Sequence, residues 1–299
     1  MTSVLITGAR GFVARSLAPV LGACGARVVG TSRHDAGNSL FAKVYEVRLG
    51  ESLRPVLERE LPDAVVHCAL DGGPDAYSLN VDGTTRWLEE SSGCGVRLQI
   101  LLSTLSATPD ALSDYGRAKH CLEQRFSSNG EVSFRLGLVV GDGGMFARLR
   151  ETSRRYPVIP LLSGGRQLVY VLGIDYLCAV LRDCIVSGGT GLKGRAWNLH
   201  TPRAYTLREV IGTINIHCGY RRVMVPIPAV PVLGMLMFLE GLGFRRLPVT
   251  SANVRGLMRQ GRVVISTDFA SFGYPEQDLD TLVAAAVGGT KPGMRSQYL

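Results

Sequence analysis

The sequence predicts an α/β protein: a Rossmann-type, doubly wound parallel sheet with a smaller C-terminal substrate-binding lobe. Two observations lead to this fold class. The apolar run at residues 4–6 is followed by glycines at 8 and 11 and a small residue at 14. This spacing is typical of a buried strand that turns into a helix around a pyrophosphate. Strand-like runs then alternate with helical patterns to about residue 145, which favours parallel strands joined by helices.

The expected elements of this first part follow from apolar runs, helical periodicity and turn residues. The first helix is expected at residues 12–24, with Pro19 inside it, and the second strand at Ala26–Gly30. The further strands are expected at Lys43–Leu49, Asp63–Leu70, Arg97–Ser103 and Val132–Val140, and the further helices at Leu53–Glu60, Asn80–Ser91 and Tyr115–Phe126. Such a sheet binds its ligand at the carboxyl ends of its strands.

The alternation becomes irregular beyond about residue 145. We expect a strand at Val169–Ile174 and helices at Arg148–Tyr156, Asp175–Ser187 and Leu207–Cys218. Thr206, with Glu209 three residues later, forms a capping box at the start of the last helix. The expected division is a dinucleotide-binding domain at 1–145, a mixed α/β substrate lobe at 146–287 that is partly interwoven with the sheet, and a flexible tail at 288–299.

Composition limits the classes of function. The 299 residues are 46% hydrophobic and 19% charged, which suits one large domain or two joined ones and excludes a disordered chain. A net charge of +8 favours anionic partners. The arginines are scattered and show no interleaving with aromatic residues, so we expect no nucleic-acid partner.

The cysteines and histidines bear on the compartment and on metals. The seven cysteines are spread out and never form a CxxC pair, which predicts the reduced thiols of a cytoplasmic protein. The five histidines are isolated, so no metal site is expected. We expect no signal peptide, because the first strand already begins at Val4.

The segment 223–244 is long and apolar. It carries one charge, Glu240, and lies between Arg221–Arg222 and Arg245–Arg246. The length would suit a membrane span, but three prolines and three glycines interrupt it. We predict a loop followed by a short apolar helix that packs in the substrate lobe. Association of this segment with a membrane surface or a protein partner is the alternative.

The end of the second strand bears on the choice of cofactor. Enzymes that prefer NAD usually carry an acidic residue there, which holds the ribose 2′-hydroxyl. This chain has Ser32 and Arg33 instead, with Arg10 in the first turn. Because these side chains suit a 2′-phosphate, NADP(H) is favoured over NAD(H). The alternative is that Arg33 only stacks on the adenine.

Tyr115 and Lys119 lie four residues apart in a predicted helix, so their side chains share one face. A free phenol has a pKa of about 10. A lysine one turn away and an oxidised nicotinamide ring would lower that pKa toward the working pH, which suits general acid–base catalysis. Ser103 and Thr104 lie where the fifth strand ends, so a hydroxyl there could hold the substrate oxygen. Taken alone, the pair could equally be an ordinary surface pair.

These motifs together carry a family resemblance. They are TGARGFV at 7–13, HCA at 67–69, NVDGT at 80–84, Ser-Thr at 103–104, YGRAK at 115–119, RLGLVVG at 135–141, GGRQLVYVLGIDYL at 164–177 and TLREV at 206–210. The chain resembles the short-chain dehydrogenase/reductase superfamily, and within it the extended, epimerase/dehydratase-type branch. The segment STLSATPDALSDYGRAKHCLE also resembles the atypical branch that includes the NADPH-binding accessory subunit of respiratory complex I and its bacterial relatives.

The resemblance implies roles for individual residues. Tyr115 would be the acid–base residue and Lys119 its modulator and ribose ligand. Thr104 would orient the substrate oxygen, with Ser103 as the second candidate. The cofactor's pyrophosphate and adjoining ribose would contact Gly8, Arg10, Gly11, Phe12, Val13, Ala69 and Leu70. Arg166 is a candidate for a substrate phosphate, and a solvated loop arginine is the alternative.

Departures from the family pattern bear on the substrate. Leu138 stands where sugar-nucleotide epimerases place an asparagine against the diphosphate, and the third strand lacks its usual terminal aspartate. These differences argue against a UDP- or dTDP-sugar. Leu105 and Ser106 offer no carboxylate, which argues against dehydration.

We therefore expect an NADP(H)-dependent oxidoreductase or epimerase. It would transfer a hydride at a secondary alcohol or ketone of a small carbonyl or nucleotide-sugar-like substrate, which could be phosphorylated. A homodimer is one assembly that we consider. The alternative is a non-catalytic NADPH-binding subunit or redox sensor.

Overall fold

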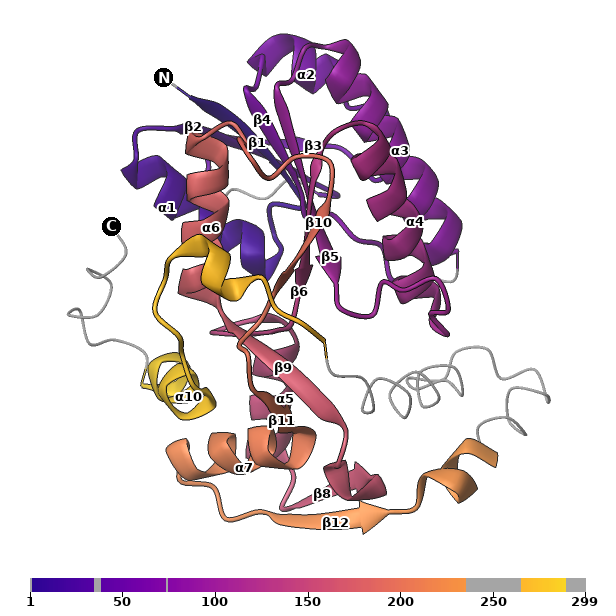
Figure 1. Ribbon diagram of the computed structural model, residues 1–299, viewed down its shortest axis with the longest axis vertical. Coiled ribbons are helices and arrows are strands. Elements are labelled where there is room, and N and C mark those ends of the chain that lie inside the picture. Colours follow the sequence, from indigo (N-terminus) through magenta and orange to yellow (C-terminus); the bar gives the residue numbers. More distant parts are fainter. Residues whose placement is uncertain (1, 35–38, 74, 235–264, 289–299) are drawn as a thin grey trace.

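A seven-stranded parallel sheet lies at the centre of the computed structural model (Figure 1), which describes residues 2–34, 39–73, 75–234 and 265–288. The strand order is β10-β6-β5-β4-β1-β2-β3, and every neighbouring pair is parallel. This arrangement confirms the doubly wound sheet. The strands are β1 Ser3–Thr7, β2 Arg27–Ser32, β3 Lys43–Glu46, β4 Ala64–His67, β5 Leu98–Thr104, β6 Val132–Leu136 and β10 Ala196–Leu199.

Helices cover both faces of the sheet. On one face lie α1 Phe12–Ala23 and α6 Ile174–Val186, and on the other α2 Arg54–Glu60, α3 Ala76–Gly93 and α4 Asp114–Ser128 (Figure 1). Alternate residues of β1 contribute to both cores. Val4 and Ile6 pack in the α1–α6 core, whereas Leu5 packs with Trp87 of α3. A strand buried on both faces needs such a continuous apolar run.

A smaller set of elements lies beyond the carboxyl ends of the strands (Figure 1). A three-stranded sheet is made of β7 Leu138–Val140, β9 Leu168–Gly173 and β11 Ala204–Thr206, and a two-stranded sheet of β8 Val158–Leu162 and β12 Val223–Ile227. Around them lie α5 Gly144–Arg155, η1 Ser163–Gly165, α7 Leu207–His217, η2 Phe269–Phe272 and α10 Leu279–Val287. The chain returns to the large sheet through α6 and β10, so this lobe is interwoven with it.

The structure corrects several expected elements. The strand expected at Val132–Val140 is interrupted at Gly137, where a Cβ atom would lie 2.5 Å from the Tyr170 carbonyl oxygen. The chain therefore leaves the large sheet, and β7 pairs with β9 instead. β4 ends at His67 rather than residue 70, and α3 begins at Ala76 rather than residue 80. The capping box at the start of α7 is confirmed.

The prediction of a loop at the start of 223–244 was wrong. Val223–Ile227 forms β12, which pairs with β8, a strand that was not predicted. The chain is helical at 229–234. Residues 235–244 and 289–299 lie outside the described residues. Within the described ranges, no helix has the length and apolar character that a membrane crossing requires.

Candidate functional site

The turn after β1 is shaped for a phosphate group. Gly8 has a φ of +71°, and a Cβ atom there would lie 3.0 Å from the Cα atom of Ala69 in the loop after β4. A Cβ at Gly11 would lie 3.0 Å from the Gly8 carbonyl oxygen. Gly11 caps α1 without a side-chain hydrogen bond, so the first N–H groups of the helix are open to an anion. The turn therefore fits the pyrophosphate of a dinucleotide.

Two polar side chains hold the rim of this site in place. The Thr7 hydroxyl accepts hydrogen bonds from the backbone N–H groups of Cys68 and Ala69, each at 3.0 Å. The amide of Asn80 on α3 accepts from the N–H of Asp71 and donates to its carbonyl oxygen. The conformation of the loop after β4 is thus determined by residues of the TG and NVDGT motifs.

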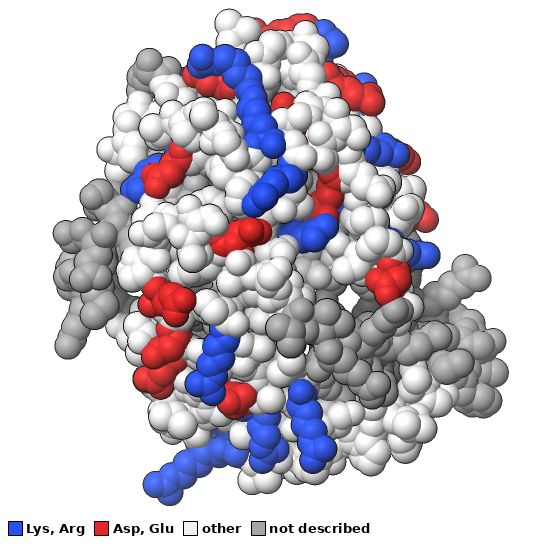
Figure 2. Space-filling view, viewed as in Figure 1, with Lys and Arg blue, Asp and Glu red and all other residues white. Residues whose placement is uncertain are grey.

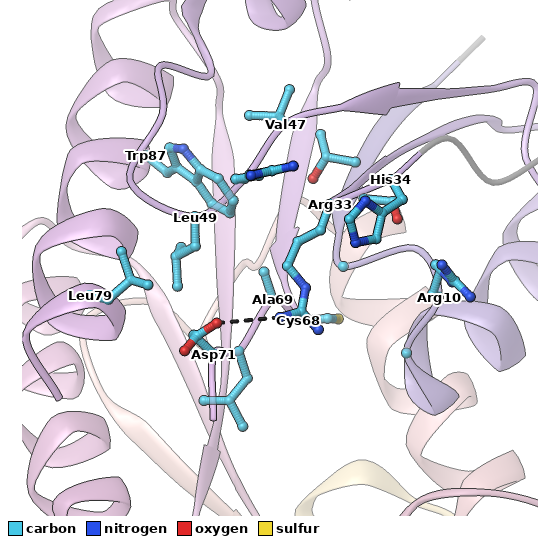
Figure 3. Close-up of a pocket in the computed structure, with 16 residues that line it drawn as sticks. Arg10, Arg33, His34, Val47, Leu49, Cys68, Ala69, Asp71, Leu79 and Trp87 are labelled. Atoms are coloured by element: carbon cyan, nitrogen blue, oxygen red, sulfur yellow. Dashed lines mark hydrogen bonds and ion pairs between the residues drawn. The ribbon is translucent and has the colours of Figure 1, made fainter. Parts of the chain in front are cut away.

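A cavity of about 850 Å³ continues from this turn along the ends of β1, β2, β3 and β4. Trp87, Leu49 and Leu79 form one side of it, and Arg10 and His34 lie on the opposite side (Figure 3). The apolar side suits an adenine ring and the basic side suits phosphate. The lining residues are Gly8, Arg10, Gly11, Thr31, Ser32, Arg33, His34, Val47, Arg48, Leu49, Cys68, Ala69, Leu70, Asp71, Leu79 and Trp87.

Arg33 crosses this cavity. Its guanidinium lies 3.4 Å from a carboxylate oxygen of Asp71 (Figure 3). Arg33 follows β2 and Asp71 follows β4, and β1 lies between these two strands in the sheet. The other carboxylate oxygen of Asp71 accepts from the Gly73 N–H at 2.7 Å. The Arg33 side chain is 65% exposed, so it can leave Asp71 at little cost.

Tyr115 and Lys119 lie on α4, whose first turn is capped by the Ser113 hydroxyl. Lys119 is only 7% exposed, and its ammonium donates to the carbonyl oxygen of Leu102 on β5 at 2.7 Å. Burial lowers the pKa of Lys119 to about 8, and the nearby Cys68 and Glu123 partly oppose that shift. Cys68, with which this charge interacts, lines the cavity.

Tyr115 is 44% exposed, yet partial desolvation of its hydroxyl raises its pKa above the usual value. No charged group of the described chain contributes to that shift. The phenol is therefore protonated at neutral pH. In this state it can donate a proton to a carbonyl oxygen.

The two hydroxyls at the end of β5 point to different partners. Ser103 is buried and donates to the carboxylate of Glu123 at 2.5 Å. Glu123 also forms a two-pronged ion pair with Arg135, at 2.6 to 3.0 Å. The hydroxyls of Thr104 and Ser106 form a hydrogen bond of 3.1 Å with each other. Ser103 is thus engaged in a buried network, whereas Thr104 is partly exposed.

Seven of the ten residues expected to bind the cofactor line this cavity, whereas the expected catalytic residues Ser103, Thr104 and Tyr115 and the substrate candidate Arg166 do not. Gly8, Arg10, Gly11, Ser32, Arg33, Ala69 and Leu70 line the cavity, while Phe12, Val13 and Lys119 do not. Phe12 instead packs against the loop before α5, where a Cβ atom at Gly143 would overlap its ring. Arg166 is exposed beside η1 in the smaller lobe.

Sequence reasoning missed Asp71 and Trp87. Trp87 is fully buried and donates its indole N–H to the Glu51 carbonyl oxygen at 2.8 Å. In the sequence it was placed only within the helix expected at Asn80–Ser91. Asp71 follows the HCA motif by two positions, and its partner lies 38 residues earlier in the chain.

Comparisons with known proteins agree with this geometry. Residues 4–131 match the model of the NAD dependent epimerase/dehydratase family. No curated protein sequence matches the chain. Among solved structures, UDP-glucose 4-epimerase with UDP-glucose from Thermotoga maritima is 18% identical, with a TM-score of 0.73, and the match covers 96% of this chain and 98% of that one.

Two further solved structures show the same fold. UDP-glucose 4-epimerase from Thermus thermophilus, in complex with NAD, is 19% identical with a TM-score of 0.66, and the match covers 88% of this chain and 100% of that one. dTDP-glucose 4,6-dehydratase from Bacillus anthracis, also with NAD, is 13% identical with a TM-score of 0.73, and the match covers 96% of each chain. At these identities the likeness establishes the fold.

Proposed function

Because residues 4–131 carry the domain of the NAD dependent epimerase/dehydratase family, we propose that the chain is a nicotinamide-dinucleotide-dependent oxidoreductase or epimerase acting on a secondary alcohol or ketone. One observation carries the proposal. The glycine turn follows β1 and fits a pyrophosphate, and the amine of Lys119 lies against Leu102 near the carboxyl end of β5, at the same edge of the parallel sheet. Residues 1–145 are proposed to bind the cofactor and residues 146–287 the substrate.

The cofactor proposed is NADP(H) in preference to NAD(H). Arg33 and Arg10 line the cavity, and β2 ends in Thr31 and Ser32 rather than in an acidic residue. A guanidinium binds phosphate through charge-assisted hydrogen bonds. Asp71 opposes this preference, since its carboxylate holds Arg33. NADPH binding therefore requires Arg33 to exchange one anionic partner for another.

The proton transfer is assigned to Tyr115. When bound, the nicotinamide ring supplies or accepts the hydride. The raised pKa of Tyr115 keeps its phenol protonated, so the hydroxyl can donate its proton to a ketone oxygen. Lys119 donates one N–H to Leu102 and has two further N–H groups with which to orient a ribose hydroxyl. Thr104 orients the substrate oxygen, because the Ser103 hydroxyl is held by Glu123.

The substrate class is a small carbonyl compound or a nucleotide-linked sugar. The three solved structures named above are described as UDP-glucose 4-epimerases or as a dTDP-glucose 4,6-dehydratase, which supports the second class, whereas Leu138 argues against it. Arg166 is exposed in the smaller lobe and is the proposed contact for a substrate phosphate.

A turnover assay on Tyr115→Phe tests this function. Wild-type protein is incubated with NADPH or NADP⁺ and a panel of ketones and nucleotide-linked sugars, with product analysis for both redox change and epimerisation. Loss of the phenol proton should lower turnover by about 10²- to 10⁴-fold and leave NADPH binding unchanged. Tyr156→Phe, a tyrosine of similar exposure after α5, is the matched control.

The alternative is a non-catalytic NADPH-binding subunit or redox sensor. Two observations favour it. The Lys119 amine is already hydrogen-bonded to the Leu102 carbonyl oxygen, and no charged group in the described part of the chain shifts the pKa of Tyr115. If Tyr115→Phe retains the full cellular function and binds NADPH normally, the enzyme assignment fails and the alternative holds.

A further inference from the structure

The two-stranded sheet of β8 and β12 is apolar on both faces. The strands read VIPLL and VMVPI. On the inner face Ile159, Leu161 and Met224 pack with Ile211 of α7. A small sheet with its other face in water is expected to carry polar residues there, but these ten positions contain none.

The outer face is a continuous aliphatic surface. Val158 pairs with Val223, and Pro160 pairs with Val225, so all four side chains lie on the same side of the ribbon. Val158 is 48% exposed, Val223 62% and Val225 40%. Contiguous exposed apolar residues of this kind mark interaction sites rather than ordinary surface.

Arginine pairs lie at one end of this ribbon. Arg154–Arg155 come just before β8, and Arg221–Arg222 come directly before β12. Because the strands are parallel and begin opposite each other, the two pairs lie at the same end. Figure 2 shows basic side chains at the lower end of the molecule, with acidic side chains beside them.

These arginines carry an excess of positive charge. Arg154 pairs with Glu151, and Arg222 donates to the backbone carbonyls of Ser153 and Arg154. Arg155 stacks on the Tyr156 ring. Neither Arg155 nor Arg221 forms an ion pair with a carboxylate among the residues that the structure describes, although Arg155 lies near enough to Glu151 to help lower the pKa of that carboxyl.

We propose that the outer face of the β8–β12 ribbon docks on an anionic lipid bilayer. The valines would enter the boundary between headgroups and acyl chains, and the arginines would contact lipid phosphates. A bilayer presents both apolar and anionic surface in the adjacent layers that this arrangement needs. The ribbon lies at the opposite end of the molecule from β2 and β3 (Figure 1), so docking leaves the dinucleotide cavity accessible.

Vesicle co-sedimentation tests this docking. Wild-type protein should sediment with vesicles of phosphatidylcholine mixed with phosphatidylglycerol, should stay in solution with phosphatidylcholine alone, and should be released by salt. The double variant Val158→Ser with Val225→Ser, and the double variant Arg155→Gln with Arg221→Gln, should each bind the mixed vesicles at least about tenfold more weakly. NADPH titration confirms that each variant is folded.

Exposed positions elsewhere provide matched controls. Val186→Ser on α6 and Arg59→Gln on α2 should leave vesicle binding unchanged. The proposal is overturned if wild-type protein ignores the mixed vesicles, or if both ribbon variants bind them as wild type does. Sedimentation velocity adds a third outcome. A wild-type dimer that the valine variant converts to a monomer would assign the face to a second copy of the chain and overturn the lipid assignment.

Discussion

Replacing Arg33 with alanine is expected to weaken NADPH binding selectively. A hydrogen bond to a charged group contributes roughly 1.5–3 kcal/mol. The wild-type guanidinium must first leave Asp71, at 3.4 Å and with its own side chain 65% exposed, and such a pair contributes about 0–1 kcal/mol. The difference, about 0.5–3 kcal/mol, corresponds to a loss of roughly 2- to 150-fold in affinity. NADH lacks the 2′-phosphate, so its affinity should change by less than about twofold.

Asp71→Asn is the complementary change. It removes the carboxylate that competes with the 2′-phosphate for Arg33, so NADPH binding should strengthen by up to about fivefold, the equivalent of about 1 kcal/mol. NADPH and NADH are titrated by nicotinamide fluorescence at low and high salt. The salt dependence of NADPH binding should decrease in Arg33→Ala. Arg48→Ala is the control, since Arg48 lines the same cavity after β3.

Three results would count against this reasoning. Equal losses of NADPH and NADH in Arg33→Ala would show that the guanidinium contacts a part common to both cofactors. A selective loss in Arg48→Ala alone would move the 2′-phosphate to the end of β3. An unchanged NADPH-to-NADH ratio in Asp71→Asn would exclude competition by the carboxylate.

Three further changes test other parts of the site. Gly8→Ala should weaken the binding of both NADPH and NADH at least about tenfold, because the φ of Gly8 is +71° and the new Cβ would lie 3.0 Å from the backbone of Ala69. Gly22→Ala, where the new Cβ meets open space, should leave both affinities unchanged. Equal affinities in the two variants would refute this. Glu123→Gln should lower the free energy of unfolding in urea by about 1–3 kcal/mol, since it breaks a buried ion pair, and a change under about 0.5 kcal/mol would contradict the assignment. Burial lowers the pKa of His67 to about 4, so on acidification the unfolded chain takes up the proton before the folded chain does. The free energy of unfolding should therefore fall as the pH drops from about 6.5 to about 4. His67→Asn should reduce the slope of that free energy against pH in denaturation experiments, and an identical slope in wild type and variant would exclude His67 as its source.

The cofactor half of the fold could be predicted from the sequence because its determinants are local. The central strands are buried on both faces and so appear as unbroken apolar runs such as residues 4–6. The backbone of Ala69 approaches Gly8 so closely that a side chain does not fit there, and the required glycine is visible in the sequence. The family match ends at residue 131, and the predicted strands and helices became irregular shortly after that point.

The second lobe was harder to predict because its strands depend on distant partners. β12 contains a proline at 226, the signal that favoured a loop, and it is stabilised by β8 about 65 residues earlier. The ion pair between Arg33 and Asp71 is equally non-local. The position of Glu123 did carry a local signal, since it lies four residues after Lys119 and eight after Tyr115 on one helix face. Of these three residues, only Tyr115 and Lys119 were predicted as site residues.

On the proposed function, the surroundings of Tyr115 in the described chain suit it to act as a proton donor. Desolvation alone raises the pKa of Tyr115, and the ammonium of Lys119 is held by Leu102, with its own pKa lowered to about 8. The described chain therefore stabilises the phenol and not the phenolate. A proton donor of this kind matches reduction of a ketone, in which the oxygen gains a proton. The opposite step needs a phenolate, so the positive charge that lowers the Tyr115 pKa would have to come from an oxidised nicotinamide ring. On this account the charge state of the cofactor, rather than a titrating side chain, determines whether Tyr115 acts as acid or base.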